Sequence, residues 1–266
     1  PATRKQDGAS ASASAVPLVR APRSRPDPTS SPVYHGDIPC EEAMMGIYLN
    51  PDNAMFQFSL DSKFYVDKTR IAAFMNDRIG RDGRYVCVSR PRRFGKSYDA
   101  DMLVAYYTRG ADSRAQFEGL DVASSPDFER HLNAHDVIKL DITQVAPYSG
   151  DCATIAMSVS AKLLPELGSA WPGALPEGES DLPHALELVR QRKGSGFVFV
   201  IDEWDSPMRE TADEASQRSY LEFLRTLLKG RAYVEACYMT GILPIKKYGV
   251  HSALNMFTEY TMVDPK

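Results

Sequence analysis

The sequence lacks long apolar runs and has few cysteines. No apolar stretch in its 266 residues approaches the ~20 residues that a helix needs to cross a bilayer, and no charged-then-apolar signal peptide opens the chain. We therefore expect no membrane interaction and a cytoplasmic location. The four cysteines form no C-x-x-C pair and have no histidine cluster nearby, which argues against a zinc site and suits a reducing compartment.

A large excess of charge of one sign is also missing. The formal net charge is -4, so no global field attracts nucleic acid. Positive charge is concentrated in the loop at 90–96 and in the arginines of the first 36 residues, and nucleic acid stays possible only through these parts or a further domain. The composition, 43% hydrophobic and 25% charged, is that of a globular protein with one large domain or two small ones.

Residues 1–36 contain almost no large apolar side chains and are rich in Ala, Ser, Pro and Arg. Such a segment cannot bury enough surface to offset its ordering entropy, so we predict a disordered tail over 1–36 and a folded domain over 37–266. The chain begins at Pro1 and stops soon after an expected strand and its loop. We therefore expect that the C-terminal part of the domain is truncated.

Within the folded part, apolar strands alternate with helical patterns. Strands are expected to begin near Tyr85, Val137, Phe197 and Tyr233. Helices are expected at 41–49, 71–79, 98–110, 150–168, 182–194 and 214–230, and the stretch at 50–64 is rich in turn residues. This alternation predicts an α/β fold whose mainly parallel sheet carries helices on both faces.

The stretch "SRPRRFGKSYDADML" (89–103) ends like a phosphate-binding loop. Gly95, Lys96 and Ser97 match the end of G-x-x-x-x-G-K-[ST], but Arg90 stands where the first glycine is usual. A strand, a turn and a helix beginning at Gly-Lys-Ser direct backbone N–H groups at an anion. Lys96 would add charge for the outer phosphates, and the Ser97 hydroxyl can ligate Mg²⁺. The alternative is a basic surface turn that contains Gly-Lys-Ser by chance.

A second motif lies more than a hundred residues downstream. In "FVFVIDEW" five apolar residues precede Asp202 and Glu203, which is the pattern of a Walker B strand. An acid at the carboxyl end of a buried parallel strand lies where ligands bind in open α/β sheets. Asp202 can hold the Mg²⁺ shell and Glu203 can polarise an attacking water. Solvated carboxylates that merely end the strand are the alternative, and the two motifs in this order favour the nucleotide site.

The adjacent Asp and Glu also indicate a branch of the P-loop NTPases. Such a pair suits ATPases of the additional-strand (ASCE) type, in which an inserted strand lies between the loop strand and the acid strand. "YVEACYMTG" (233–241) is the expected insert, and Thr240 at its tip would face the γ-phosphate as a sensor hydroxyl. Thr240 and Gly241 could equally be a strand-ending turn. The predicted fold is a three-layer P-loop NTPase sandwich.

Four stretches together resemble one family. "FYVDKT" (64–69), "SRPRRFGKS" (89–97), "VIDEWDSP" (200–207) and "MTGILPIKKYGVHSALNMF" (239–257) are similar to the predicted AAA-ATPase-like family, whose phosphate loop reads R-P-R-R-F-G-K-[ST] without a leading glycine. The resemblance implies catalytic roles for Lys96, Glu203 and Thr240 and Mg²⁺ ligation by Ser97 and Asp202. It also implies that ATP binds along the loop, at Arg92, Arg93, Phe94, Gly95, Lys96, Ser97 and Tyr98.

Some roles stay open within this resemblance. Arg92 and Arg93 contact phosphates or a neighbouring subunit, or are solvated. The "YVDKT" stretch lies near the base or braces the first helix, and Asp67 and Lys68 could be an ordinary exposed pair. The role of Trp204 and Asp205 is not evident from the sequence.

The resemblance also bears on the whole protein. Family members commonly continue into a lid and a PD-(D/E)XK nuclease-like domain, and we recognise neither here, nor a fifth strand. The expected function is a Mg²⁺-dependent ATP-binding domain that hydrolyses ATP to switch an attached C-terminal effector domain or a partner. A second copy of the chain, in a homo-oligomer, is a further expected partner. The alternative is a non-hydrolysing nucleotide-binding scaffold or interaction module.

Overall fold

The computed structural model of the chain describes residues 44–145, 154–211, 213–245 and 253–262. The predicted tail at 1–36, Cys40, Cys152 and the first residues of the helix expected at 150–168 lie outside them. Within the described residues, no helix is both long and apolar enough to span a bilayer.

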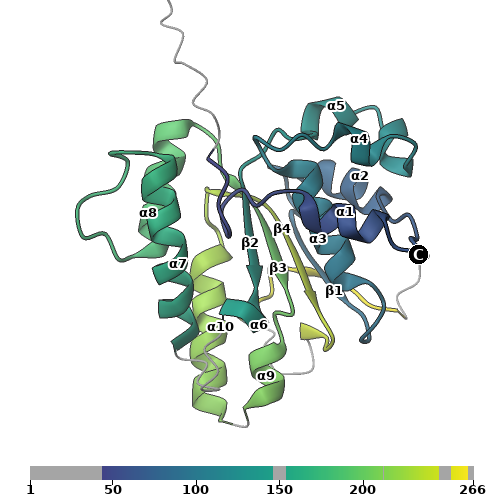
Figure 1. Cartoon of the computed structure of the whole chain (residues 1–266). Helices are drawn as coiled ribbons and strands as arrows, with labels where there is room; N and C mark the ends of the chain where they lie inside the picture. The colour runs from purple at the N-terminus through teal and green to yellow at the C-terminus, as the bar shows by residue number, and fades with distance from the viewer. Residues whose placement is uncertain (1–43, 146–153, 212, 246–252, 263–266) are drawn as a thin grey trace, which may run out of the picture. The chain divides into compact units, whose positions relative to one another are not determined.

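One sheet of five strands forms the centre of the molecule (Figure 1). Its strand order is β2-β3-β4-β1-β5, and every neighbouring pair is parallel. The strands are β1 (Tyr85–Ser89), β2 (Val137–Asp141), β3 (Phe197–Asp202), β4 (Val234–Gly241) and β5 (Thr258–Tyr260). Because β4 lies between β1 and β3, the predicted additional strand is confirmed.

The fifth strand, which the sequence was expected to lack, is present. β5 has only three residues, Thr-Glu-Tyr, and none of them is buried, so it carries no apolar run that a sequence pattern could detect. It is held by parallel pairing with β1 and by ring contacts on both sides. Phe257 meets Tyr85 at 5.6 Å and Tyr260 meets Phe74 at 5.5 Å between ring centroids.

Helices cover both faces of the sheet, as the three-layer prediction requires (Figure 1). On one face lie α7 (Ile155–Ala170), α8 (Leu182–Lys193) and α10 (Glu214–Leu228), packed on inward-facing residues such as Phe199 and Met239. On the other lie α1 (Ala54–Leu60), α2 (Arg70–Asn76) and α3 (Lys96–Tyr107), whose buried residues form one cluster with Val200 and Tyr238 of the sheet. β3 is buried on both faces, and this explains its uninterrupted apolar sequence.

The helix α3 differs from its prediction. We expected an amphipathic helix at 98–110, but α3 begins at Lys96 and ends at Tyr107, and its side chains are buried almost all round. The reason is that α1 and α2 pack over its outer side, away from the sheet. Tyr107, for example, is fully buried, and its hydroxyl lies 2.8 Å from Asn76 Oδ1 and 3.2 Å from the Ala72 carbonyl oxygen, the two acceptors within its reach.

The segment before α3 was predicted wrongly in two places. Described residues of the helix expected at 41–49 are not helical, because the backbone N–H groups of Ile47, Tyr48 and Leu49 donate to the carboxylate of Glu166 instead. The turn-rich stretch at 50–64 contains α1, which is stabilised by stacking of Phe56 on Phe117 at 4.9 Å.

Short elements complete the described fold. They are α4 (Arg114–Phe117), a 3-10 turn at Asp121–Ser124, α5 (Phe128–His131), α6 (Ile142–Val145) and α9 (Ser206–Glu210). Two of them matter for the site, because α6 follows the carboxyl end of β2 and α9 follows the carboxyl end of β3.

Candidate functional site

The loop between β1 and α3 has an unusual backbone. Gly95, which precedes α3, has φ 76°, and Arg93 has φ 70° although it is not glycine. A Cβ atom on Gly95 would lie 2.8 Å from Nζ of Lys68. Glycine is therefore required at position 95 both by the backbone conformation and by the close approach of a lysine.

Arg90, at the position of the missing first glycine, joins three strands. Its backbone N–H donates to the Gly241 carbonyl at 3.1 Å, at the end of β4. Its guanidinium Nη1 donates to the carbonyls of Ser89, at 3.1 Å, and Tyr260, at 3.3 Å. The side chain thus ties the carboxyl ends of β1 and β5 together, a contact that glycine could not make.

Lys68 braces the same loop from outside. Its Nζ donates to the Phe94 carbonyl at 2.9 Å and contacts Asp99 Oδ1, in the first turn of α3, at 3.1 Å. Burial of Asp99 raises its pKa to about 6, although the Lys68 ammonium acts in the opposite direction. Asp67 does not pair with Lys68. Its carboxylate accepts from the backbone N–H groups of Thr69 and Asp121, at 2.8 and 2.7 Å.

The acidic end of β3 lies beside the tip of β4. Asp202 is buried, and its Oδ1 accepts from the Thr240 hydroxyl at 2.7 Å and from the Glu203 backbone N–H at 2.9 Å. Thr240 itself is fully buried. The structure therefore brings together the carboxylate and the hydroxyl that the sequence analysis singled out on separate strands.

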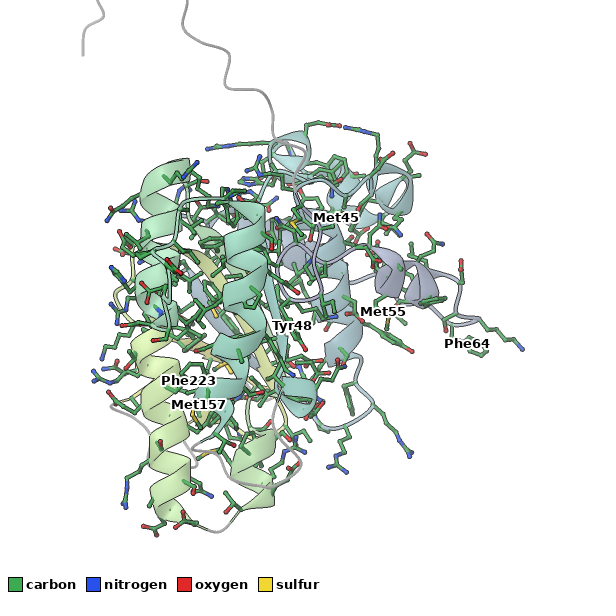
Figure 2. The ribbon with its side chains drawn as sticks, turned by 60° about the vertical axis from the view of Figure 1, so that its left-hand side comes forward. Met45, Tyr48, Met55, Phe64, Met157 and Phe223 are labelled. Atoms are coloured by element: carbon green, nitrogen blue, oxygen red, sulfur yellow. The ribbon has the colours of Figure 1, made fainter. Side chains whose placement is uncertain are left out.

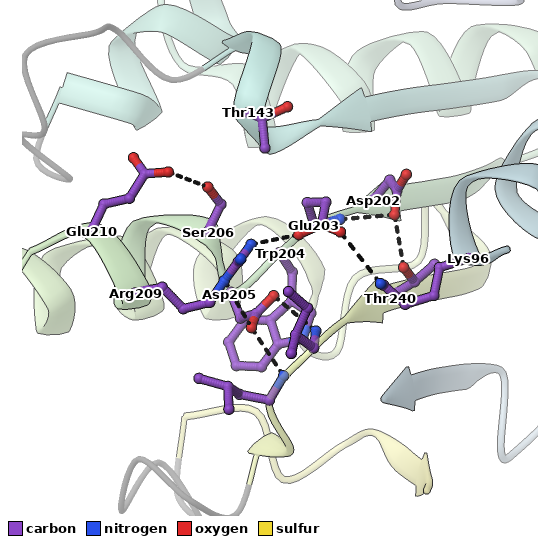
Figure 3. Close-up of polar contacts among 12 residues, drawn as sticks. Lys96, Thr143, Asp202, Glu203, Trp204, Asp205, Ser206, Arg209, Glu210 and Thr240 are labelled. Carbon is purple, nitrogen blue, oxygen red and sulfur yellow. Dashed lines mark hydrogen bonds and ion pairs between the residues drawn. The ribbon is translucent and has the colours of Figure 1, made fainter. Parts of the chain in front are cut away.

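Glu203 is held between two cations (Figure 3). Its Oε1 lies 3.4 Å from Nζ of Lys96, and its Oε2 lies 2.5 Å from Nη2 of Arg209 on α9. The backbone of Glu203 is left-handed, with φ 51°, which turns the chain sharply at the end of β3. This carboxylate links the phosphate loop to α9.

Trp204 and Asp205 support the turn from beneath. Asp205 is fully buried, and its carboxylate accepts from the backbone N–H groups of Ile242 and Leu243 at 3.1 and 3.0 Å. The Asp205 Oδ2 atom also lies 3.2 Å from Nε of Arg209. A Cβ on Gly241 would lie 2.5 Å from the Trp204 indole nitrogen, so glycine is required there by packing.

A cavity of about 580 Å³ opens above these groups. It brings Lys96, Ser97 and Glu203 to one surface, whereas Asp202 and Thr240 lie behind that surface. The complete lining is Arg92, Arg93, Gly95, Lys96, Ser97, Tyr98, Thr143, Glu203, Ser206, Arg209 and Glu210.

A second cavity, of about 240 Å³, adjoins the same loop. It shares Arg93, Gly95 and Tyr98 with the first cavity. Phe94 lines only this second cavity and not the first. Its other lining residues are Phe64, Tyr65, Val66, Lys68, Asp99 and Met102. Phe64 is 80% exposed and lies at the outer end of its loop (Figure 2).

A third cavity, of about 540 Å³, contains no residue of the phosphate loop or of the end of β3. It is lined by Met45, Tyr48 and Met55, which Figure 2 labels, and by Lys139 and Asp141 among others.

Among the described residues there is no cluster of three or more His, Cys, Asp or Glu side chains that could hold a metal ion by itself. The oxygen-bearing side chains near the loop include the Ser97 hydroxyl, which lines the cavity, and the Asp202 carboxylate, which is buried behind it. Such a pair fits Mg²⁺, which is usually bound by one or two protein oxygens together with substrate phosphates and water.

Arg209, α9 and the bracing role of Lys68 were missed by the sequence analysis. A signal for α9 existed, because Pro207 follows Ser206 directly after the acids and proline is favoured in the first helical turn. No local pattern shows that Arg209 returns to Glu203, since this depends on the left-handed turn between them.

Comparison with known proteins agrees with the fold. A curated relative, described as "Uncharacterized protein in vnfD 5'region" of Azotobacter chroococcum mcd 1, is 27% identical over 205 residues, covering 73% of this chain and 37% of that protein. The chain thus spans little more than a third of the relative's length. A family model described as "Predicted AAA-ATPase" matches residues 55–251, from α1 to beyond the end of β4. The chain belongs to the predicted AAA-ATPase family.

Proposed function

We propose that the loop and the end of β3 form an ATP-binding and ATP-hydrolysing site that uses Mg²⁺. The observation that carries the proposal is the contact between Lys96 and Glu203 at 3.4 Å, which joins the phosphate loop to the acidic strand end. Membership of the predicted AAA-ATPase family supports nucleotide binding. The pairing of an anion-binding loop with two adjacent acids suits hydrolysis rather than binding alone.

The phosphates would bind over the loop and the first turn of α3. The first N–H groups of a helix have no partner within it and attract anions, and α3 is twelve residues long. Lys96 supplies a positive charge beside them. Ser97 and Asp202 would hold Mg²⁺, which neutralises charge on the phosphate oxygens.

The base would bind on the other side of the loop, in the second cavity. Phe64 and Tyr98 expose aromatic rings there, and Tyr98 borders both cavities, so one ligand can contact the two sides. Aromatic side chains stack on the face of a purine. This arrangement supports the prediction that the "YVDKT" stretch lies near the base, while Lys68 braces the loop.

Hydrolysis would need Glu203 as the group that accepts a proton from water. In the structure its carboxylate is paired with Lys96 and Arg209, so it must first be released. Binding of the terminal phosphate offers Lys96 another anion and would free one carboxylate oxygen. Thr240 would hold the Asp202 carboxylate in position, because its buried hydroxyl donates to Asp202 Oδ1.

The change between bound and free states would act on an attached domain or a partner, or on a second copy of the chain. The greater length of the curated relative is consistent with an additional domain. A non-hydrolysing scaffold remains the second candidate function, favoured by the two cations that occupy Glu203.

Phosphate release from Mg²⁺-ATP and nucleotide binding by calorimetry test the proposal. Lys96→Ala should abolish binding, whereas Lys229→Ala, at the exposed end of α10, should not. Glu203→Gln should retain binding and lose phosphate release, with Glu222→Gln on α10 as the matched control. Binding without release in the unmodified chain would favour the scaffold, and equal turnover in Glu203→Gln would refute its role.

A further inference from the structure

Four basic residues line the 580 Å³ cavity within the described part of the chain. Arg92, Arg93 and Lys96 come from the phosphate loop and the start of α3, whereas Arg209 comes from α9. Its side chain is only 19% exposed. Nε lies 3.2 Å from the buried carboxylate of Asp205, which is itself fixed by two backbone N–H groups. The inner edge of the guanidinium therefore lies within ion-pair distance of Asp205, while its Nη2 contacts Glu203, which lines the cavity.

The Glu203 carboxylate lies between Nη2 of Arg209 and Nζ of Lys96 (Figure 3). Two cations that contact the two oxygens of one carboxylate are spaced to contact two oxygens of one phosphoryl group. A phosphoryl group carries more negative charge and more acceptor oxygens than a carboxylate. It also matches the fork of a guanidinium, which binds phosphate through two parallel hydrogen bonds.

We propose that Arg209 binds the outermost phosphate of the nucleotide and thereby distinguishes a triphosphate from a diphosphate. This proposal rests on the proposed function. In the nucleotide-free chain Glu203 takes the place of that phosphate between the two cations. When the triphosphate binds, Arg209 and Lys96 turn to the phosphate oxygens and Glu203 is released to face water.

A diphosphate contacts the loop and the first turn of α3 without reaching Arg209, so the Glu203–Arg209 pair persists. The residue thus couples the release of Glu203 to the presence of the substrate. The ion pair between Arg209 Nε and Asp205 can persist while Nη2 exchanges the Glu203 carboxylate for a phosphate oxygen.

The test is calorimetric titration of the 266-residue chain with a non-hydrolysable ATP analogue and with ADP, both with Mg²⁺. Arg209→Gln should weaken binding of the analogue by about tenfold to a hundredfold, the loss expected for one charge-assisted contact, and should change ADP binding by less than about twofold. Arg225→Gln on α10, whose partner Glu222 is exposed, is the matched control and should change neither.

Glu203→Gln gives an independent measurement if Arg209→Gln does not fold. Removing the negative charge of Glu203, which competes with the outermost phosphate for Arg209 and Lys96, should strengthen binding of the analogue severalfold. The affinity for ADP should stay unchanged. Equal weakening of both nucleotides by Arg209→Gln, or no change for either, would overturn the role of Arg209 alone. If the unmodified chain bound neither nucleotide, both this proposal and the proposed function would be wrong.

Discussion

Replacing Asp205 by Asn tests whether the buried carboxylate stabilises the acidic end of β3. Asp205 accepts from two backbone N–H groups with its two oxygens and also pairs with Arg209. Asn has one carbonyl oxygen, so its NH₂ group would face one of those N–H donors and Arg209 would lose an anion. We expect the fold to be destabilised while its overall architecture is retained.

The expected magnitude follows from these contacts. One buried donor left without an acceptor costs about 1–3 kcal/mol. Breaking a buried ion pair costs about 3–5 kcal/mol, and the lower end applies because Arg209 keeps Glu203 as a partner. Since the two terms overlap, we expect a loss of about 3 kcal/mol in the free energy of unfolding.

Urea denaturation followed by far-UV circular dichroism measures this loss. With an m-value of about 3 kcal/mol/M, the midpoint should fall by about 1 M at unchanged m. Asp213→Asn is the matched control, because Asp213 also accepts from two backbone N–H groups, those of Ala215 and Ser216, but at the exposed start of α10. If the Asp213 variant lost as much stability as the Asp205 variant, burial of the Asp205 carboxylate would not be the cause.

Three further results are expected. Gly241→Ala should lower the free energy of unfolding by about 1–3 kcal/mol, because the added methyl group would overpack against Trp204. Gly168→Ala, in open space on α7, should raise it by about 0.5–1 kcal/mol. Equal effects of the two substitutions in thermal melts would contradict this reasoning. Because Asp99 has a raised pKa of about 6, its ionisation opposes folding, so the unmodified chain should lose about 2 kcal/mol relative to Asp99→Asn between pH 4 and pH 7. A pH-independent difference between the two denaturation curves would refute that raised pKa. Tyr98→Ala should weaken the binding of ATP about tenfold, as measured by calorimetry, but leave the binding of inorganic tripolyphosphate unchanged. An equal loss of affinity for both ligands would exclude base stacking on this ring.

The core strands could be predicted because each is an apolar run of the right length. The run from Phe197 to Ile201 ends in Asp202 and Glu203, and its position as a strand buried on both faces follows from this pattern. The phosphate loop was likewise recognisable from Gly95, Lys96 and Ser97 between a strand and a helix. These features depend on residues adjacent in sequence, so local periodicity records them.

The elements that were missed depend on partners elsewhere in the chain. β5 is short and polar and exists because it pairs with β1. Residues 47–49 are not helical because Glu166, more than a hundred residues away, accepts their N–H groups. Neither outcome leaves a periodic trace in the segment concerned.

The site shows the same division between local and distant contacts. The sequence by itself determined which residue types are present and in which order: a glycine that can adopt a left-handed conformation, a lysine after it, and two acids at the end of a buried strand. Only the tertiary structure decided that Arg90 ties strand ends together, that Lys68 braces the loop, and that Arg209 and Lys96 share the Glu203 carboxylate. The physical reason is that hydrogen bonds and ion pairs form between atoms that the folded backbone brings within about 3 Å, and their separation along the chain carries no signal of that proximity.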